Sequence, residues 1–160
     1  MLPKLMYERL DEMGLDVTVV YPTFGLLAPH LDDEEIRRAA CRAFNSYHAD
    51  VFREYNDRII PVAVIPMHTP QEAVEELEYA VKTLGMKTVM LAGHVLRPVP
   101  YVAHKAPDVA KYAYWLDTFC LESEHNYDPV WAKCVELKVA PTFHSAGMGW
   151  GHRTSISTYM

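Results

Sequence analysis

The sequence has little cysteine and no long apolar run, and both shortages limit what kind of protein it can be. Its three cysteines, Cys41, Cys120 and Cys134, are scattered and lack the C-x-x-C spacing of redox and zinc motifs. We therefore expect buried, reduced thiols in a cytoplasmic protein. No apolar run approaches the ~18 residues of a membrane-spanning helix. The N-terminal stretch MLPKLMYERL also lacks the apolar core of a secretory signal.

Charge of one sign is not concentrated anywhere in the sequence. The formal net charge is −6, and acidic and basic residues are interspersed without a basic stripe. A nucleic-acid partner or an anionic membrane surface is therefore not expected. Several catalytic motifs are missing as well: there is no G-x-S-x-G elbow, no G-x-x-x-x-G-K-[ST] phosphate loop, no H-x-H and no H-E-x-x-H.

The sequence does contain an alternation of strand-like and helical segments, and 50% of its 160 residues are apolar. Short runs rich in β-branched residues predict strands at 16–22, 59–66, 87–93 and 139–144. Apolar residues at helical spacing predict helices over 3–13, 32–56, 69–85 and 128–137. Residues 94–127 are rich in proline, tyrosine and histidine, and we expect only a short helix around 108–122 within them.

Two of the predicted helices begin with capping signals. Asp32 has Glu35 three residues later, and Thr69 is followed by a proline and then by Glu72. In the longer helix, the apolar stripe that we expect to face the core consists of Ile36, Ala40, Ala43, Tyr47, Val51 and Tyr55.

Strands separated by helices indicate a parallel sheet with crossover connections, so we predict a single α/β domain over residues 1–160. Two arrangements stay open at this point. The strands can form part of a (β/α)8 barrel, or a self-contained, flavodoxin-like open sheet that binds a small ligand or a partner without catalysis. Sequential strand order would favour the barrel, and a reversal of order would favour the open sheet.

Histidines follow three of the four predicted strands. Ligands bind beyond the carboxyl ends of the strands in parallel α/β folds, which is where His68, His94 and His144 are expected. His144 comes directly after an apolar strand and is either a metal ligand or a hydrogen-bonded rim histidine. The same two interpretations apply to His94. His68 precedes the N-cap Thr69, so a capping or loop role suits it better than metal binding.

Arg97 and Trp150 flank the predicted rim. An arginine and an aromatic ring beside a metal can clamp a carboxylate substrate, although an arginine on a solvated loop is the more common case. The long segment 94–127 leaves from this rim, and loops of such length more often form lids or binding walls than plain connections.

Two stretches, RIIPVAVIPMHTPQEAVEELEYAVKTLGMKTVMLAGHV and VAPTFHS, resemble the amidohydrolase-related metal enzymes (the amidohydrolase 2 group), which include aminocarboxymuconate-semialdehyde decarboxylase. The resemblance implies a partial TIM (β/α)8 barrel, truncated at both ends, to which this chain contributes strands two to five and the tail of helix one. It matches His144 to the metal-binding histidine of strand five and His94 to a rim position near the substrate. The H-x-H of strand one, the catalytic histidine of strand six and the aspartate of strand eight have no counterpart here, so no catalytic residue is assigned.

The resemblance further implies a divalent metal, with Zn²⁺ as the expected ion, that supports hydrolysis or non-oxidative decarboxylation of a small carboxylated substrate. His144 would bind the metal, and His94, Arg97 and Trp150 would lie on the substrate side. A half barrel leaves strand edges unpaired, which favours a homo-oligomer or a partner chain that completes the barrel. We expect weak or no catalysis from these 160 residues alone.

Overall fold

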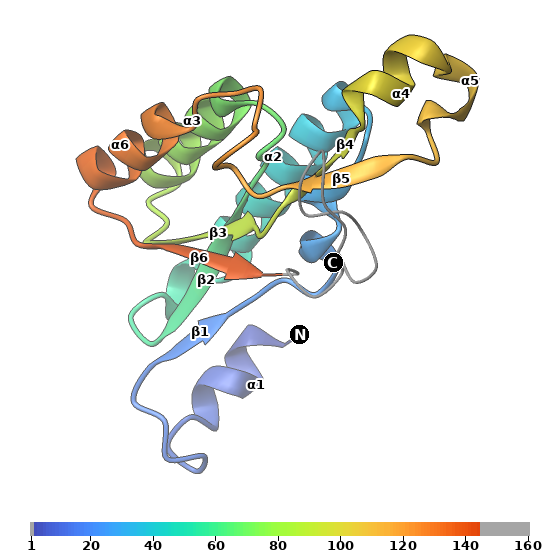
Figure 1. Ribbon diagram of the computed structural model, residues 1–160. Coiled ribbons are helices and arrows are strands. Elements are labelled where there is room, and N and C mark those ends of the chain that lie inside the picture. Colours follow the sequence, from blue (N-terminus) through green and yellow to red (C-terminus); the bar gives the residue numbers. More distant parts are fainter. Residues whose placement is uncertain (1, 145–160) are drawn as a thin grey trace.

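The computed structural model describes residues 2–144, and its centre is a four-stranded parallel sheet (Figure 1). The strands are β1 (Thr18–Val20), β2 (Ile59–Ile65), β3 (Thr88–Ala92) and β6 (Pro141–His144). They lie in the order β1-β2-β3-β6, and every pair is parallel. This sequential order confirms the predicted half-barrel, and it lacks the reversal that a doubly wound sheet requires.

Helices connect the successive strands and cover the sheet. The α-helices of this layer are α1 (Pro3–Glu8), α2 (Glu34–Val51), α3 (Pro70–Glu78) and α6 (Asp128–Leu137). Shorter helical turns are η1 (Phe24–Leu26), η2 (Ala28–His30), η3 (Arg53–Tyr55) and the π-helical η4 (Tyr79–Thr83), which prolongs α3. Figure 1 shows α3 and α6 side by side on one flank of the sheet, so their shared apolar surface forms the larger part of the core.

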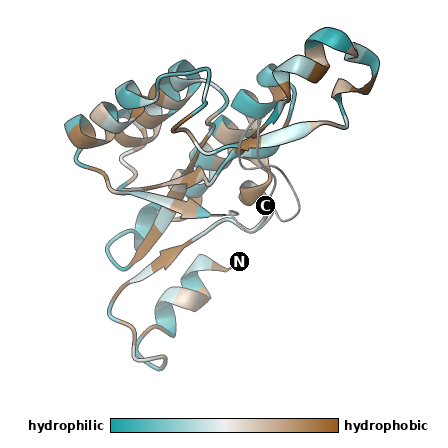
Figure 2. Cartoon of the chain, in the orientation of Figure 1, coloured by the Kyte–Doolittle hydropathy of each residue, from teal (hydrophilic) through white to brown (hydrophobic). Residues whose placement is uncertain are grey.

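Strand β2 is buried on both faces, which explains its continuous apolar sequence. Ile65 packs in a cluster with Leu77 of α3 and Val130 of α6. On the other face, Val64 packs with Cys41 of α2. Figure 2 shows the hydrophobic colour concentrated along the central strands, and this apolar centre holds their carboxyl ends in place.

The pairing between β1 and β2 covers only the amino-terminal part of β2, where Thr18–Val20 lies beside Ile59–Pro61. Further along β2, the side chain of Asn45 takes the place of a neighbouring strand. Its Nδ2 donates to the carbonyl oxygen of Val64 at 2.9 Å, and its Oδ1 accepts from the Val64 N–H at 2.7 Å. At Val64 the edge of β2 therefore stays hydrogen-bonded although β1 has ended.

The segment η1–η2 fills the space beside this edge. Ala28 packs against Val62 and Val64 in the same cluster as α2. Gly25 is buried, and a Cβ atom there would lie 2.7 Å from Cγ of Pro22. Only glycine allows this close approach, so the loop after β1 has one defined path into the rim.

The two predicted helix caps have different outcomes. The α3 cap is confirmed, because Thr69 Oγ1 accepts from the N–H of Glu72 and the Glu72 carboxylate accepts from the N–H of Thr69. The predicted cap at Asp32 is wrong by one residue, since Asp33 accepts from the N–H of Ile36 at 2.9 Å. Two consecutive aspartates offer the same capping chemistry, and the backbone selects the second.

The predicted apolar stripe of α2 is only partly confirmed: Ala40 and Val51 pack against the core, but the most deeply buried residues of the helix lie outside the stripe. The buried residues of the helix are Arg37, Cys41 and Asn45, whereas Ile36 and Tyr47 of the stripe are 58% and 63% exposed. Polar side chains are stable in a core when each has partners, and two of these three have them in β2 and α3. Hydropathy alone therefore misses the buried polar residues and places Ile36 and Tyr47 in the core, where they do not lie.

Residues 94–127 contain an antiparallel ribbon and two short helices. The ribbon consists of β4 (Val95–Pro98) and β5 (Tyr114–Asp117), and the helices are α4 (Pro100–Lys105) and α5 (Pro107–Ala110). Figure 1 shows α4 and α5 projecting away from the sheet. The predicted helix around 108–122 is wrong, because the chain turns after α5 and pairs with β4, burying Trp115 and Leu116.

The cysteines are all free thiols. Cys41 and Cys134 are buried as expected, but Cys120 is exposed in the loop after β5, so the prediction of burial is wrong for this residue. Within residues 2–144, none of the helices combines the length and the apolar character needed to cross a lipid bilayer.

Candidate functional site at the carboxyl rim

The carboxyl ends of the parallel strands form one rim, as predicted. In a flat sheet with about 4.8 Å between strands, the edge strands β1 and β6 would lie about 14 Å apart. The ring of Tyr21, directly after β1, nevertheless lies 6.0 Å from the ring of His144 at the end of β6, measured between centroids. The sheet therefore curls, and side chains from its two edges converge at the mouth.

His144 is the last residue of β6 and lies where the metal-binding histidine is predicted. It is in register with Ala92, its carbonyl oxygen accepts from the N–H of Gly93 at 3.1 Å, and it is exposed. Within residues 2–144, no group of three or more His, Cys, Asp and Glu side chains is arranged to hold a metal ion. A catalytic zinc usually has three protein ligands. His144 thus fits the role of one ligand, and the described part of the chain does not hold a complete metal site.

A second group of histidines lies deeper at the same rim. His94 is 4% exposed, and its ring centroid is 5.4 Å from that of His30. The Nε2 atom of His30 and the Nδ1 atom of His68 are buried without a hydrogen-bond partner. Burial lowers the pKa of His30, while burial and the nearby Arg37, Arg97 and His30 lower the pKa of His68 to about 3. His30 and His68 are therefore uncharged at neutral pH.

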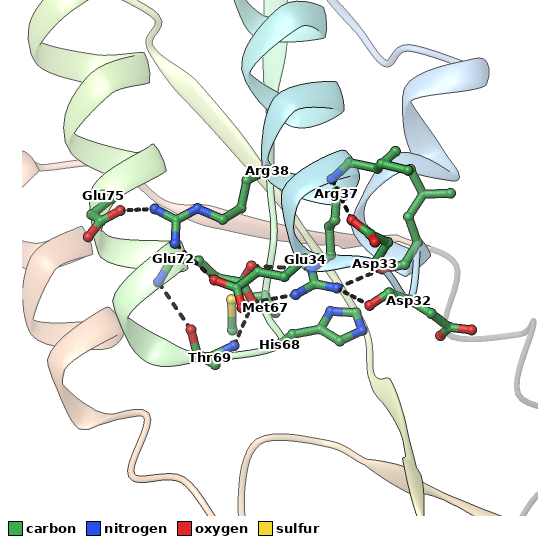
Figure 3. A network of polar contacts seen from close by, with 12 residues as sticks. Asp32, Asp33, Glu34, Arg37, Arg38, Met67, His68, Thr69, Glu72 and Glu75 are labelled. Carbon is green, nitrogen blue, oxygen red and sulfur yellow. Dashed lines mark hydrogen bonds and ion pairs between the residues drawn. The ribbon is translucent and has the colours of Figure 1, made fainter. Parts of the chain in front are cut away.

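Arg37 of α2 lies beside the imidazole of His68, as Figure 3 shows. It forms an ion pair with Glu72 of α3, with 3.2 Å between Nε and Oε2 and side-chain exposures of 4% and 1%. The same guanidinium donates to two main-chain carbonyls of the loop between β1 and α2. A buried positive charge at the rim is thus fully compensated by protein groups.

Arg97 of β4 holds the main chain of His68 from the other side. Its Nη2 donates to the carbonyl oxygen of His68 at 2.7 Å and to the hydroxyl of Tyr127 at 3.0 Å. Its Nε donates at 2.9 Å to Asp117, whose side chain is completely buried. The remaining nitrogen, Nη1, faces the exposed carboxylate of Glu124 at 3.7 Å. Arg97 therefore joins the projecting ribbon to the end of β2.

Asp117 also organises the loop that follows β5. Its carboxylate accepts from the N–H of Phe119 at 2.8 Å and from the hydroxyl of Ser123 at 2.7 Å. Phe119 and Glu122 both have a positive φ, 67° and 68°, which residues with a side chain rarely adopt. The bonds to Asp117 hold this strained loop against the rim.

Sequence reasoning identified the rim but missed several of its residues. Arg37, Asp117 and His30 carry no local signal, because their partners lie in distant segments of the chain. Glu72 was visible only as a capping residue, although it is also the partner of Arg37. Trp150, predicted on the substrate side, lies outside the described residues.

Comparison with known proteins gives a family and several similar folds. A family model described as amidohydrolase matches residues 5–159. The 2,6-dihydroxybenzoate decarboxylase from Rhizobium has a similar fold, with a TM-score of 0.65 and 19% identity, over 88% of this chain and 38% of that chain. These findings agree with the resemblance seen in the sequence.

Two further decarboxylase structures are similar and were solved with bound manganese. The dihydroxybenzoic acid decarboxylase from Polaromonas sp., with the inhibitor 2-nitroresorcinol, has a TM-score of 0.64 and 20% identity over 86% of this chain and 36% of that chain. The 5-carboxyvanillate decarboxylase from Novosphingobium aromaticivorans has a TM-score of 0.61 and 19% identity over 92% and 34%. The chain thus spans little more than a third of the length of these proteins.

Proposed function

The chain belongs to the amidohydrolase family, and from this premise we propose that it is part of a metal-dependent enzyme acting on a small carboxylated substrate. The observation that carries the proposal is the exposed imidazole of His144 at the mouth of the curled sheet. Non-oxidative decarboxylation is proposed ahead of hydrolysis, because several proteins of similar fold are named decarboxylases.

In this proposal His144 is one ligand of a divalent metal ion. Imidazole nitrogen is a suitable ligand for Zn²⁺, the ion expected from the sequence, whereas two proteins of similar fold carry manganese. A bound divalent ion acts as a Lewis acid or lowers the pKa of a bound water. Since residues 2–144 lack a group of three metal-binding side chains, the other ligands would come from further segments of the protein.

We place His94 and Arg97 on the substrate side of the rim. Asp117 and the carbonyl oxygen of His68 occupy two guanidinium nitrogens of Arg97 and fix its orientation. Within residues 2–144, the partner of Nη1 is the exposed Glu124 carboxylate at 3.7 Å, and a substrate carboxylate can take that place in a charge-assisted hydrogen bond. Trp150 is proposed as an aromatic neighbour on sequence grounds alone.

We also propose that further strands complete the sheet. Among the described strands, β1 pairs only with β2 and β6 only with β3, and unpaired edges favour association. The additional strands would belong to the same protein, to a second copy or to a partner chain. Light scattering over a range of concentrations separates these cases, because a mass that rises with concentration requires a second chain. The cytoplasm, where an exposed thiol such as Cys120 stays reduced, is the proposed location.

The central test is the metal content of the full-length protein, with the segments that would supply the other ligands, measured by mass spectrometry with His144→Ala as the variant. His104 is exposed on α4, away from the rim, so His104→Ala is the matched control. We expect metal binding at least about tenfold weaker in His144→Ala and unchanged in the control. Unchanged metal content in His144→Ala would reject His144 as a ligand. If the metal-loaded protein releases no CO2 from hydroxylated benzoates, decarboxylation of such substrates is rejected.

A further inference from the structure

The ion pair between Arg37 and Glu72 differs from the other contacts between α2 and α3. Its side chains are 4% and 1% exposed, whereas in the neighbouring pair of Arg42 and Glu76 the arginine is 43% exposed. Removing two charges from water is unfavourable, and a buried ion pair often adds no net stability compared with apolar residues. The burial of Arg37 therefore indicates a role other than holding two helices together.

Arg37 forms hydrogen bonds with the main chain of the loop that leads into α2. Its Nη1 donates to the carbonyl oxygen of Leu31 at 2.7 Å and to that of Asp32 at 2.9 Å. These are the two residues that follow His30 in the chain. A single guanidinium nitrogen thus fixes the main chain immediately after one of the buried rim histidines.

The same guanidinium is linked to the loop that leaves β2. Its Nε donates to the Glu72 carboxylate, which also accepts from the N–H of Thr69 at 2.7 Å. Thr69 follows His68 directly, and the carbonyl oxygen of His68 is held at 2.7 Å by Arg97. The peptide group that joins His68 to Thr69 therefore has a charged partner at both its oxygen and its nitrogen.

We propose that Arg37 is a positioning residue of the rim, which fixes the loops of His30 and His68 relative to each other through one buried guanidinium. The purpose of this arrangement rests on the proposed function, since the rim is the site where a substrate would bind. The contacts themselves involve neither a metal nor a substrate.

The charges around His68 give this arrangement a second consequence. Besides burial of the ring, the groups that disfavour its protonation are Arg37 from α2, Arg97 from β4 and His30 from η2. The carboxylates that pair with the two arginines are Glu72, Asp117 and Glu124. An uncharged imidazole can donate one hydrogen bond and accept another. Arg37 thus holds the main chain after His68 in place and adds to the effect of burial in keeping the imidazole uncharged, the form that suits an uncharged hydroxyl or carbonyl group.

Hydrogen–deuterium exchange of the full protein at neutral pH, without added metal or substrate, tests the proposal. The variant is Arg37→Met, and the matched control is Arg42→Met, which breaks the neighbouring pair between the same helices. We expect exchange in residues 24–33 and 66–72 to be about tenfold faster in Arg37→Met, as the loss of one to two hydrogen bonds implies, and unchanged in Arg42→Met. Equal acceleration in both variants, or acceleration confined to α2 and α3, would overturn the proposal.

A second measurement separates the position of His68 from its charge. In imidazole NMR spectra at pH 5, the protonated fraction of His68 should rise about tenfold in Arg37→Met, because a neighbouring cation has been removed. Arg37→Lys keeps the charge opposite Glu72, so it should fold, retain the wild-type protonation of His68 and still loosen residues 24–33. Wild-type exchange of that loop in Arg37→Lys would contradict the proposed role of the hydrogen bonds from Arg37 to the carbonyl oxygens of Leu31 and Asp32. Failure of the metal-binding test leaves these results unaffected.

Discussion

Acidification from pH 7 to pH 5 should destabilise the protein partly through His68, and His68→Gln should remove that part. The pKa of His68 is about 3 in the folded protein and 6.5 for an ordinary histidine. The folded state therefore disfavours the proton, so the stabilisation is complete above the ordinary pKa and is lost as the pH falls below it. At pH 5 the unfolded chain carries the proton and the folded chain does not, which amounts to at most about 2 kcal/mol. The ring is not fully enclosed, so we expect about 1 kcal/mol.

Urea unfolding followed by tryptophan fluorescence at pH 7 and pH 5 measures this effect. The wild-type protein should lose about 1 kcal/mol more than His68→Gln between the two pH values. Other histidines with a lowered pKa, His30 and His48, act in the same direction in both proteins and cancel in the difference. The lowered pKa values of Glu78 and Glu136 matter only below 4.5. Equal losses in the wild type and the variant would refute the reasoning.

Three substitutions test the packing that places the rim, each by urea unfolding at pH 7. Asn45→Ala should lower the free energy of unfolding by about 3 kcal/mol, because it leaves the buried N–H and carbonyl of Val64 without partners; a loss below 1 kcal/mol would mean that water replaces the amide. Thr69→Ala should lower it by about 1 kcal/mol through loss of the cap on Glu72, and no change would show that the cap is dispensable. Gly25→Ala should lower it by about 1–3 kcal/mol, since its Cβ would overlap Pro22, and wild-type stability would mean that the loop relaxes.

The four strands of the parallel sheet could be predicted from the sequence, because local residue patterns determine them, whereas their sequential order was implied only by the family resemblance. Continuous β-branched and apolar residues identify β2, and Thr69 with Glu72 identifies the start of α3. The rim follows directly, since parallel strands place their carboxyl ends together. His144 therefore lies at the predicted edge of the sheet, whereas its metal-binding role remains a prediction.

The interior of the rim could not be predicted, because its contacts join residues that are far apart in the chain. Arg37 and Glu72 are separated by 35 positions, and Arg97 and Asp117 by 20. An arginine in a helix normally faces water, so its burial becomes visible only when a carboxylate from another element lies opposite. The same non-local pairing explains why the apolar stripe of α2 missed the buried Arg37 and Asn45 and why the ribbon of β4 and β5 was not predicted.

The amide of Asn45 forms the hydrogen bonds with β2 that a neighbouring strand would form. It thereby separates the hydrogen bonding of the strand edge from the course of the loop between β1 and α2, two features that normally vary together. Lengthening or reshaping the chain between β1 and α2 leaves the hydrogen bonding of Val64 intact, because a side chain from the helix supplies it. A change in that loop therefore acts on β2 through the packing of Gly25 and Ala28, and not through the hydrogen bonds that align the strand.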